Sequence, residues 1–352
     1  MSYNTEQREV ILHKDGPALV VAGPGSGKTA VLTARIEYLI RHYHIPPSQI
    51  LVLSFTRAAS REIEHRFQSR TGEKTVTFGT IHAVFYRILK ISRPQTASLV
   101  IPSFVRRQFI REYLLEEAGW EEAAQEKIEQ IEAALLRGEE DGPKPDPEEC
   151  GIDLEAAGAF YERRKRENGL LDFTDILRDC LRFLESDEEA RNWWRRRFRY
   201  VMVDEYQDVS PLQQRLLKLL TGPGGNLLAV GDEDQSIYAF RGSDSTSVLR
   251  FEREFPGAVR YTLVRCYRCS PQILRCARVL IAHNTKRFPK ELISEAEPGE
   301  EPVRRVFTDH PSEMRAVAEE IRRSLGRDCE AKQIAVLART RFSLRRMAAA
   351  TQ

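Results

Sequence analysis

The sequence predicts an α/β protein whose core is a parallel β-sheet. Short apolar runs bounded by turn residues recur along the chain, which indicates strands that are buried on both faces. Segments with helical periodicity lie between these runs, in the order of βαβ units. The first run leads through a glycine-rich loop directly into a helical segment, and this strand–loop–helix order is a further mark of an open parallel sheet.

Six short segments are predicted as strands: Ala18–Val21, Ile50–Ser54, Thr75–Phe78, Tyr200–Val203, Leu227–Val230 and Val259–Leu263. The helix after the glycine-rich loop is predicted at Val31–Ile40.

Residues 91–197 interrupt the alternation, because they are heavily charged and helical in pattern. Helices are predicted at Phe104–Ala118 and Gln125–Leu136, followed by a break rich in proline and aspartate at 141–149. We interpret this stretch as a helical insertion in the first α/β domain. Near its end, Trp193 and Trp194 precede bunched arginines; we expect a helix that packs its tryptophans onto the sheet, and a nucleic-acid contact stays open.

A second α/β unit is predicted after residue 263, and it is incomplete. Its predicted elements, interrupted by a polar linker at 294–302, are the helix Pro271–His283, the strand Val303–Phe307, the helix Pro311–Leu325, the strand Gln333–Ala338 and the helix Phe342–Ala350. So few strands make a poor parallel sheet by themselves.

Composition excludes several classes of protein. The formal net charge is only +2, so any nucleic-acid footprint must be local. The N-terminus is polar and no apolar run reaches membrane-spanning length, so we expect a soluble, cytoplasmic protein without membrane contact.

The six cysteines do not form the dense pattern of a disulfide-stapled domain. Cys266 and Cys269 form a CxxC pair, but no second pair at a suitable spacing completes a zinc or iron–sulfur site. We interpret the cysteines as reduced structural thiols.

The glycine-rich loop indicates a nucleotide site. It consists of Ala22, Gly23, Pro24, Gly25, Ser26 and Gly27, followed by Lys28 and Thr29. Glycines allow the backbone N–H groups to point at phosphates, and the following helix adds its N-terminal dipole. Lys28 is expected to reach the β- and γ-phosphates and Thr29 to offer its hydroxyl to Mg²⁺, so the sequence predicts binding of ATP or GTP.

Two acids complete the predicted site. Asp204 and Glu205 end an apolar strand, and the carboxyl ends of parallel strands are where ligands of open α/β sheets bind. We expect Asp204 to hold the Mg²⁺ shell and Glu205 to activate the attacking water as a general base.

Several sequence blocks, in order, resemble those of superfamily one DNA helicases of the UvrD/Rep/PcrA type. The similar blocks are 5–9, 54–59, 78–82, 170–175, 205–208, 231–242, 264–268 and 334–340, together with the glycine-rich loop. The resemblance implies a RecA-like P-loop NTPase fold, with residues 1–90 and 198–263 as the first RecA-like domain. Residues 91–197 are then the insertion and residues 264–352 part of a second RecA-like domain.

The resemblance also implies roles. Gln7 would read the adenine edge and Tyr267 would stack on the base. Gln235 would sense the γ-phosphate, with support from Arg241, and Arg268 would act as an arginine finger. Residues implied to face single-stranded DNA, or a junction of single and double strands, are Phe55, Thr56, His82, Tyr238 and Phe240. At the 264–268 block, Cys266 and Cys269 stand where relatives commonly have Asn and Ser.

The expected function is ATP-dependent movement on single-stranded DNA, 3′ to 5′ in the complete family, and GTP is disfavoured because Gln7 fits adenine. Later blocks of the family lie beyond Thr340, so we expect either a fragment or a shortened relative. Its hydrolysis would be crippled unless a partner chain or self-association completes the cleft. A non-motor module that binds ATP and single-stranded DNA is the alternative; a helicase–nuclease relative has no supporting nuclease segment. The pathway (DNA repair, replication restart or plasmid maintenance) stays open.

Overall fold

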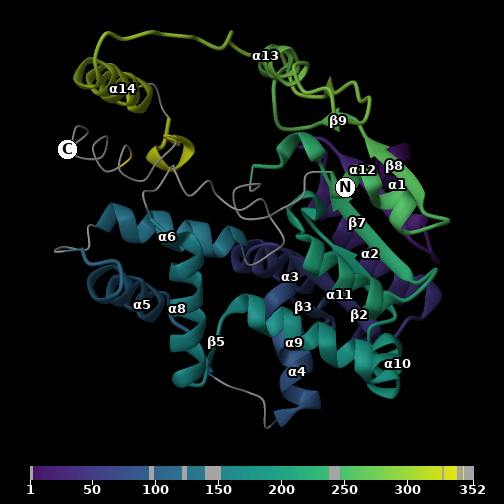
Figure 1. Cartoon of the computed structure of the whole chain (residues 1–352). Helices are drawn as coiled ribbons and strands as arrows, with labels where there is room; N and C mark the ends of the chain where they lie inside the picture. Colours follow the sequence, from purple (N-terminus) through teal and green to yellow (C-terminus); the bar gives the residue numbers. More distant parts are fainter. Residues whose placement is uncertain are drawn as a thin grey trace. The chain divides into compact units, whose positions relative to one another are not determined.

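The computed structural model describes residues 3–94, 99–120, 125–138, 152–237, 246–326, 329–338 and Leu344. Two compact units make up the chain, Met1–Gly299 and Glu300–Gln352, and each is described by itself. Figure 1 shows the course of the chain. The predicted division into two RecA-like domains and an insertion, with boundaries at 90, 197 and 263, stays a prediction.

A six-stranded sheet forms the centre of the first unit, in the order β3-β2-β6-β7-β1-β8. Its strands are β1 (Ala18–Ala22), β2 (Ile50–Ser54), β3 (Thr77–Thr80), β6 (Tyr200–Val203), β7 (Asn226–Gly231) and β8 (Val259–Leu263). Every neighbouring pair is parallel, which confirms the predicted α/β fold. Only β3 begins later than predicted, because the Glu73 carboxylate binds the amide and hydroxyl of Thr75 and holds that residue in a turn.

Alternate residues of the four central strands β1, β2, β6 and β7 pack into two separate cores. In β1, Leu19 and Val21 belong to one cluster, and Ala18, Val20 and Ala22 to the other. The first cluster is covered by α4 (Ile81–Ser92), α9 (Phe173–Ser186), α11 (Pro211–Thr221) and α12 (Ser247–Glu254). The second is covered by α1 (Thr5–Leu12), α2 (Lys28–Tyr43) and α3 (Arg57–Thr71). Burial on both faces explains why these strands read as continuous apolar runs.

The tryptophan pair divides between core and surface. In α10 (Glu188–Arg197), Trp194 is buried in the first cluster and stacks on Phe198, whereas Trp193 is 48% exposed. Only one of the two tryptophans therefore packs onto the sheet as expected.

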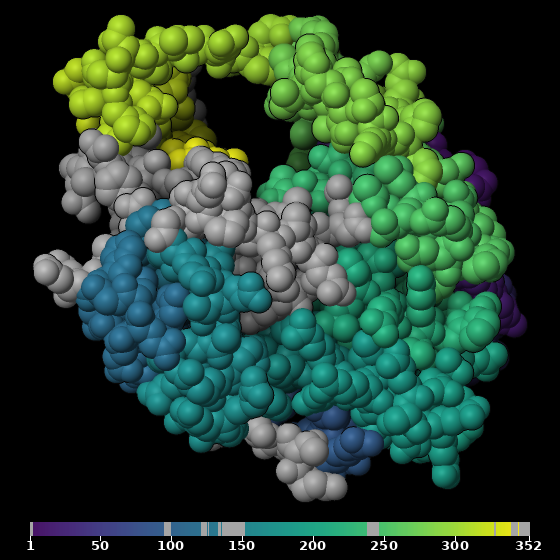
Figure 2. All heavy atoms as spheres, in the orientation of Figure 1, coloured from purple at the N-terminus to yellow at the C-terminus, as the bar shows by residue number. Residues whose placement is uncertain are grey.

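The predicted helical insertion is present. It contains α5 (Ser103–Glu116), α6 (Gln125–Gly138) and α8 (Leu154–Glu167), which pack around a small apolar core of their own. Their atoms form one continuous blue-to-teal body in Figure 2. A short parallel pair, β4 (Leu99–Val100) with β5 (Leu170–Leu171), closes it toward α9. The predicted break at 141–149 lies outside the described residues.

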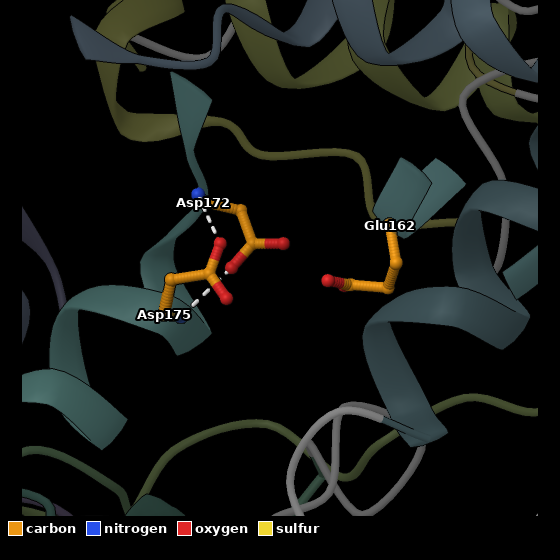
Figure 3. Close-up of side chains that lie close together, drawn as sticks. All are labelled: Glu162, Asp172 and Asp175. Atoms are coloured by element: carbon orange, nitrogen blue, oxygen red, sulfur yellow. Dashed lines mark hydrogen bonds between the residues drawn. The ribbon is translucent and has the colours of Figure 1, made fainter. Parts of the chain in front are cut away.

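A buried lysine joins α8 to the start of α9. The ammonium of Lys165 lies 2.5 Å from Asp172, 2.7 Å from Asp175 and 2.7 Å from Glu162, and its side chain is 2% exposed. Figure 3 shows the three carboxylates turned toward one another, an arrangement that could hold a metal ion. Burial alone would lower the pKa of Lys165, but the carboxylates outweigh it and raise the pKa, so the ammonium supplies the positive charge there.

The chain continues from the sheet through β9 (Arg265–Cys266), α13 (Pro271–Ile281) and β10 (Ile293–Ser294), and β9 pairs with β10 in parallel. The second unit contains α14 (His310–Leu325), where a helix was predicted. The strands predicted at 303–307 and 333–338 are wrong: those residues carry no strand, and Val303, Val306 and Leu337 are 76%, 83% and 93% exposed. A strand needs neighbours for its backbone groups, and the described part of this unit offers none. The helix predicted at 342–350 lies almost wholly outside the described residues.

None of the described helices is long and apolar enough to cross a membrane.

Replacing Lys165 tests its structural role. Lys165→Met leaves buried carboxylates without their cation, so we expect the free energy of unfolding to fall by about 3–5 kcal/mol. Urea unfolding followed by circular dichroism measures the change. Lys90→Met, on the exposed face of α4, is the control and should change stability by less than about 0.5 kcal/mol. Equal stability of the two variants would contradict the assignment.

Candidate functional site

The glycine-rich loop connects β1 to α2 through two left-handed residues. Gly25 has φ of 69° and Gly27 has φ of 85°, conformations that side chains other than glycine rarely adopt. Gly27 is also the N-cap of α2, and no side chain caps that helix. The first N–H groups of α2 are therefore left to an anion, and the helix dipole favours one there.

The N-terminal helix α1 is attached to this loop through Gln7. The buried Gln7 amide donates from Nε2 to the Ser26 carbonyl at 3.0 Å, while its Oε1 accepts from the Asn4 N–H at 3.2 Å. The Asn4 amide in turn donates to the Tyr267 hydroxyl at 2.9 Å. Gln7 and Tyr267, far apart in sequence, are thus connected to each other through Asn4 beside the loop.

The segment carrying Tyr267 and Arg268 lies directly on the loop. The Tyr267 N–H donates to the Gly25 carbonyl at 3.0 Å. A Cβ atom on Gly25 would come within 2.6 Å of the Arg268 Cβ and 3.0 Å of the Cys266 sulfur, so only glycine fits at this close approach. The Tyr267 side chain is 49% exposed and able to receive a planar ligand.

Lys28 meets the acids that follow β6. Its ammonium lies 3.0 Å from Oε2 of Glu205, which is 177 residues further along the chain. Glu205 adopts a left-handed conformation with φ of 53°, a strained choice for a glutamate that directs its side chain to the loop. The Gln207 amide donates to the same carboxylate at 2.8 Å.

Asp204 and Asp208 are aspartates whose pKa values are raised well above the ordinary value. Burial first, and then the charge of Glu205, raise the pKa of each to about 7. Within the described part of the chain, Oδ1 of each is buried without a hydrogen-bond partner. An unsatisfied buried carboxylate oxygen fits a cation that joins later, and Mg²⁺ prefers such hard oxygen ligands.

The turn after β7, the acidic turn, comprises Asp232, Glu233, Asp234 and Gln235. Lys290 is its counter-charge: the ammonium lies 2.5 Å from Asp232, 2.9 Å from Glu233 and 3.0 Å from Asp234, and the side chain is 1% exposed. Arg287 adds three hydrogen bonds to Asp234. Although the three carboxylates could hold a metal ion, Lys290 supplies the positive charge that they need.

Asp232 links the acidic turn to Glu205. Its carboxylate accepts from the Gln235 side-chain amide, and its backbone N–H donates to the side-chain Oε1 of Gln207 at 3.0 Å. Because Gln207 also binds Glu205, a chain of hydrogen bonds runs from Lys28 to Gln235. Sequence reasoning missed Gln207 and Lys290; Lys290 carried no local signal, since its partners lie more than 50 residues away.

Besides the residues around the glycine-rich loop, a hollow lies at the same edge of the sheet, beyond β2. It measures about 400 Å³ and is lined by Phe55, Arg57, Thr80, His82, Ala83, Tyr86, Val100, Phe173 and Ile176. The rings of His82 and Phe173 meet edge to face at 5.2 Å. Burial lowers the pKa of His82 to about 4, so the imidazole is neutral at pH 7.

The hollow contains two of the five residues expected to face DNA, Phe55 and His82. Thr56 instead caps α3 by accepting from the Ala59 N–H. Tyr238 and Phe240, as well as Arg241, lie outside the described residues. Phe173, 44% exposed, also lines the hollow; it was not among the five, although its block 170–175 had been singled out.

Comparison with known families matches both parts of this chain. The model of the UvrD/REP helicase N-terminal domain matches residues 3–256, and that of the UvrD-like helicase C-terminal domain matches residues 261–350. The chain belongs to the UvrD/REP helicase family. This membership confirms the family resemblance and fits the parallel sheet with its helical insertion.

Individual members of the UvrD/REP helicase family resemble most of this chain. A putative ATP-dependent DNA helicase YjcD of Bacillus subtilis is 32% identical over 96% of the chain, and the ATP-dependent DNA helicase UvrD1 of Mycobacterium tuberculosis is 33% identical over 97%. The ATP-dependent DNA helicase PcrA of Bacillus subtilis is 32% identical over 84%. The chain spans 46%, 47% and 41% of these relatives, about half of their length or slightly less.

The raised pKa of Asp204 has a measurable consequence for stability. Its folded-state pKa of about 7 lies above the unfolded value of 3.8, so the protonated acid stabilises the fold at low pH and this contribution is lost as the pH rises from about 4 to 7. Asp204→Asn removes that loss. We expect the variant to gain about 2–3 kcal/mol relative to the unsubstituted chain between pH 5 and pH 8, in urea unfolding without nucleotide or Mg²⁺. A difference independent of pH would contradict the raised pKa.

Proposed function

We propose that this chain of the UvrD/REP helicase family binds ATP with Mg²⁺ and couples its hydrolysis to movement along single-stranded DNA. The observation that carries the proposal is the contact of Lys28 with Glu205. It brings the lysine of the glycine-rich loop and a candidate general base from a distant strand to 3.0 Å. The two residues had been expected from different sequence patterns to serve one reaction, Lys28 by reaching the β- and γ-phosphates and Glu205 by activating the attacking water.

The loop and its neighbours offer a place for each part of ATP. The open N–H groups at the start of α2 and the Lys28 ammonium suit the phosphates. Tyr267, held over Gly25, suits the adenine ring as a stacking surface. Gln7 already gives its amide to Ser26, so it would meet adenine only by sharing or exchanging that hydrogen bond.

Thr29 and Asp204 would hold the Mg²⁺, which neutralises phosphate charge when it is bound. Without nucleotide, Glu205 is paired with Lys28. A triphosphate attracts the Lys28 ammonium toward itself, and Glu205 is then free to accept a proton from water. Arg268 would place a further positive charge against the transferring phosphoryl group. Gln235 would report the phosphate's presence through Asp232 and Gln207.

The hollow beyond β2 suits single-stranded DNA. Phe55 and Phe173 provide faces on which bases of any sequence stack, and Arg57 provides charge for a phosphate. The nucleotide site lies nearby along the sheet, because the Asp204 N–H donates to the Leu53 carbonyl at 2.8 Å, two residues before Phe55. A shift at the nucleotide thus has a short backbone route to the DNA.

Three further features are proposed for the working protein as a whole. They are translocation 3′ to 5′, action at junctions of single and double strands, and completion of the cleft by a partner chain or a second copy. The second candidate is binding of ATP and single-stranded DNA without turnover. It is favoured by the lack of strands in the described residues 300–326 and 329–338.

ATP hydrolysis by the purified chain, with and without single-stranded DNA, tests the proposal. We expect DNA to stimulate hydrolysis and Lys28→Ala to lower it by about 10²-fold or more, since the phosphate loses its fixed cation. Lys74→Ala, an exposed lysine outside the site, is the matched control. Nucleotide binding without turnover above the Lys28→Ala background would favour the second candidate.

Aromatic truncation tests the DNA surface. Phe55→Ala and Phe173→Ala should each weaken binding of a fluorescent oligothymidylate by about 5- to 150-fold, as expected for the loss of one stacked base. Phe104→Ala removes an aromatic ring that is 70% exposed on α5, away from the hollow, and should leave binding unchanged. If all three variants bound equally, the hollow would not be the DNA site.

A further inference from the structure

We propose that Cys266 and Cys269 form an oxidisable dithiol, a modification site whose disulfide weakens nucleotide binding. The effect on nucleotide rests on the proposed ATP site, whereas formation of the disulfide does not. The pair brackets Tyr267 and Arg268, the two residues that lie on the glycine-rich loop.

The two cysteines lie close together. The Cys269 N–H donates to the Cys266 sulfur at 3.4 Å. Residues 267–269 form a bend, which brings the first and fourth residues of the CxxC sequence together. Disulfide formation requires Cβ atoms that converge, and a bend that directs the Cys269 N–H at the Cys266 sulfur brings the pair within reach of that geometry once the bend adjusts.

The pair differs in exposure, and this sets the order of events. Cys269 is partly exposed, whereas Cys266 is completely buried. Hydrogen peroxide would therefore meet Cys269 first and convert its thiolate to a sulfenic acid, releasing hydroxide. The Cys266 sulfur then attacks the sulfenic sulfur, the S–O bond breaks and water leaves. In total, two thiols and one peroxide give one disulfide and two waters.

Oxidation is expected to be slow at neutral pH. Burial, and then the neighbouring Cys266, raise the pKa of the Cys269 thiol, and the thiolate is the reactive form. The site thus suits a response to sustained oxidant rather than to a brief exposure.

The disulfide would act on the loop through fixed contacts. Cys266 cannot move far, because it is part of β9 and its sulfur lies against Gly25. The adjustment falls on residues 267–269, whose ends are held by the Tyr267 bond to Gly25 and by the Ser294 hydroxyl bond to the Cys269 carbonyl. Drawing the sulfurs to about 2.05 Å therefore changes the backbone that carries Tyr267 and Arg268, the two residues proposed to meet the nucleotide.

Peptide mapping tests the chemistry directly. The chain is treated with hydrogen peroxide, alkylated and digested with trypsin, which cleaves after Arg265, Arg268 and Arg275. A disulfide then joins peptide 266–268 to peptide 269–275. We expect this linked pair in the unsubstituted chain and in Cys276→Ser, which removes an exposed thiol on α13, and not in Cys269→Ser.

Nucleotide affinity tests the consequence. A fluorescent ATP analogue should bind the oxidised chain about tenfold more weakly than the reduced chain, and dithiothreitol should restore binding. Cys276→Ser should behave like the unsubstituted chain, and Cys269→Ser should show no response to peroxide.

Three outcomes would overturn the proposal. One is the absence of the linked pair, with Cys269 proceeding to sulfinic acid. Another is a link from Cys269 to Cys276 instead. The third is the expected link with unchanged affinity, which would leave a disulfide without regulatory effect. If the reduced chain binds no nucleotide, the proposed ATP site fails, while the linked pair still reports the dithiol.

Discussion

The contact between Lys28 and Glu205 depends on the order of strands in the sheet. Strand β7 lies between β1 and β6, so the segments that follow these three strands emerge side by side at the carboxyl edge. The glycine-rich loop, the acids after β6 and the acidic turn after β7 all come from that edge. A different strand order with the same sequence blocks would leave the lysine and the glutamate apart, and the chain of hydrogen bonds through Gln207 and Asp232 would not exist.

Buried charge is treated in two contrasting ways in this molecule. Around Lys165 and Lys290 every carboxylate has an ammonium within about 3 Å, so the two lysines balance the negative charge of these clusters. Asp204 and Asp208 keep a buried oxygen that no described group satisfies. Two neighbouring acids of raised pKa, each with a buried oxygen that lacks a partner, indicate a site that is completed by something outside the chain.

Features that depend on residues close together in the chain could be predicted from the sequence. The glycine-rich loop, the acids ending β6 and the strands buried on both faces are contiguous patterns, and the structure has them where they were predicted. Lys290 owes its surroundings to residues distant in sequence, so no pattern around it revealed its contacts. Phe173 lies in a block that had been singled out, but only the fold brings it beside Phe55 and His82. The strands predicted at 303–307 and 333–338 failed for a related reason: an apolar run becomes a strand only when neighbouring strands accept its backbone hydrogen bonds.

The place of Lys290 also bears on where this protein can be divided. The two family models meet between residues 256 and 261, which invites expression of the N-terminal part alone. A fragment ending there would lose β8, the edge strand beside β1. It would also leave the buried carboxylates of Asp232 and Glu233 without the Lys290 ammonium. The acidic turn belongs to one sequence domain and its counter-charge to the next. An autonomous fragment therefore has to run through to the end of the first compact unit, near Gly299.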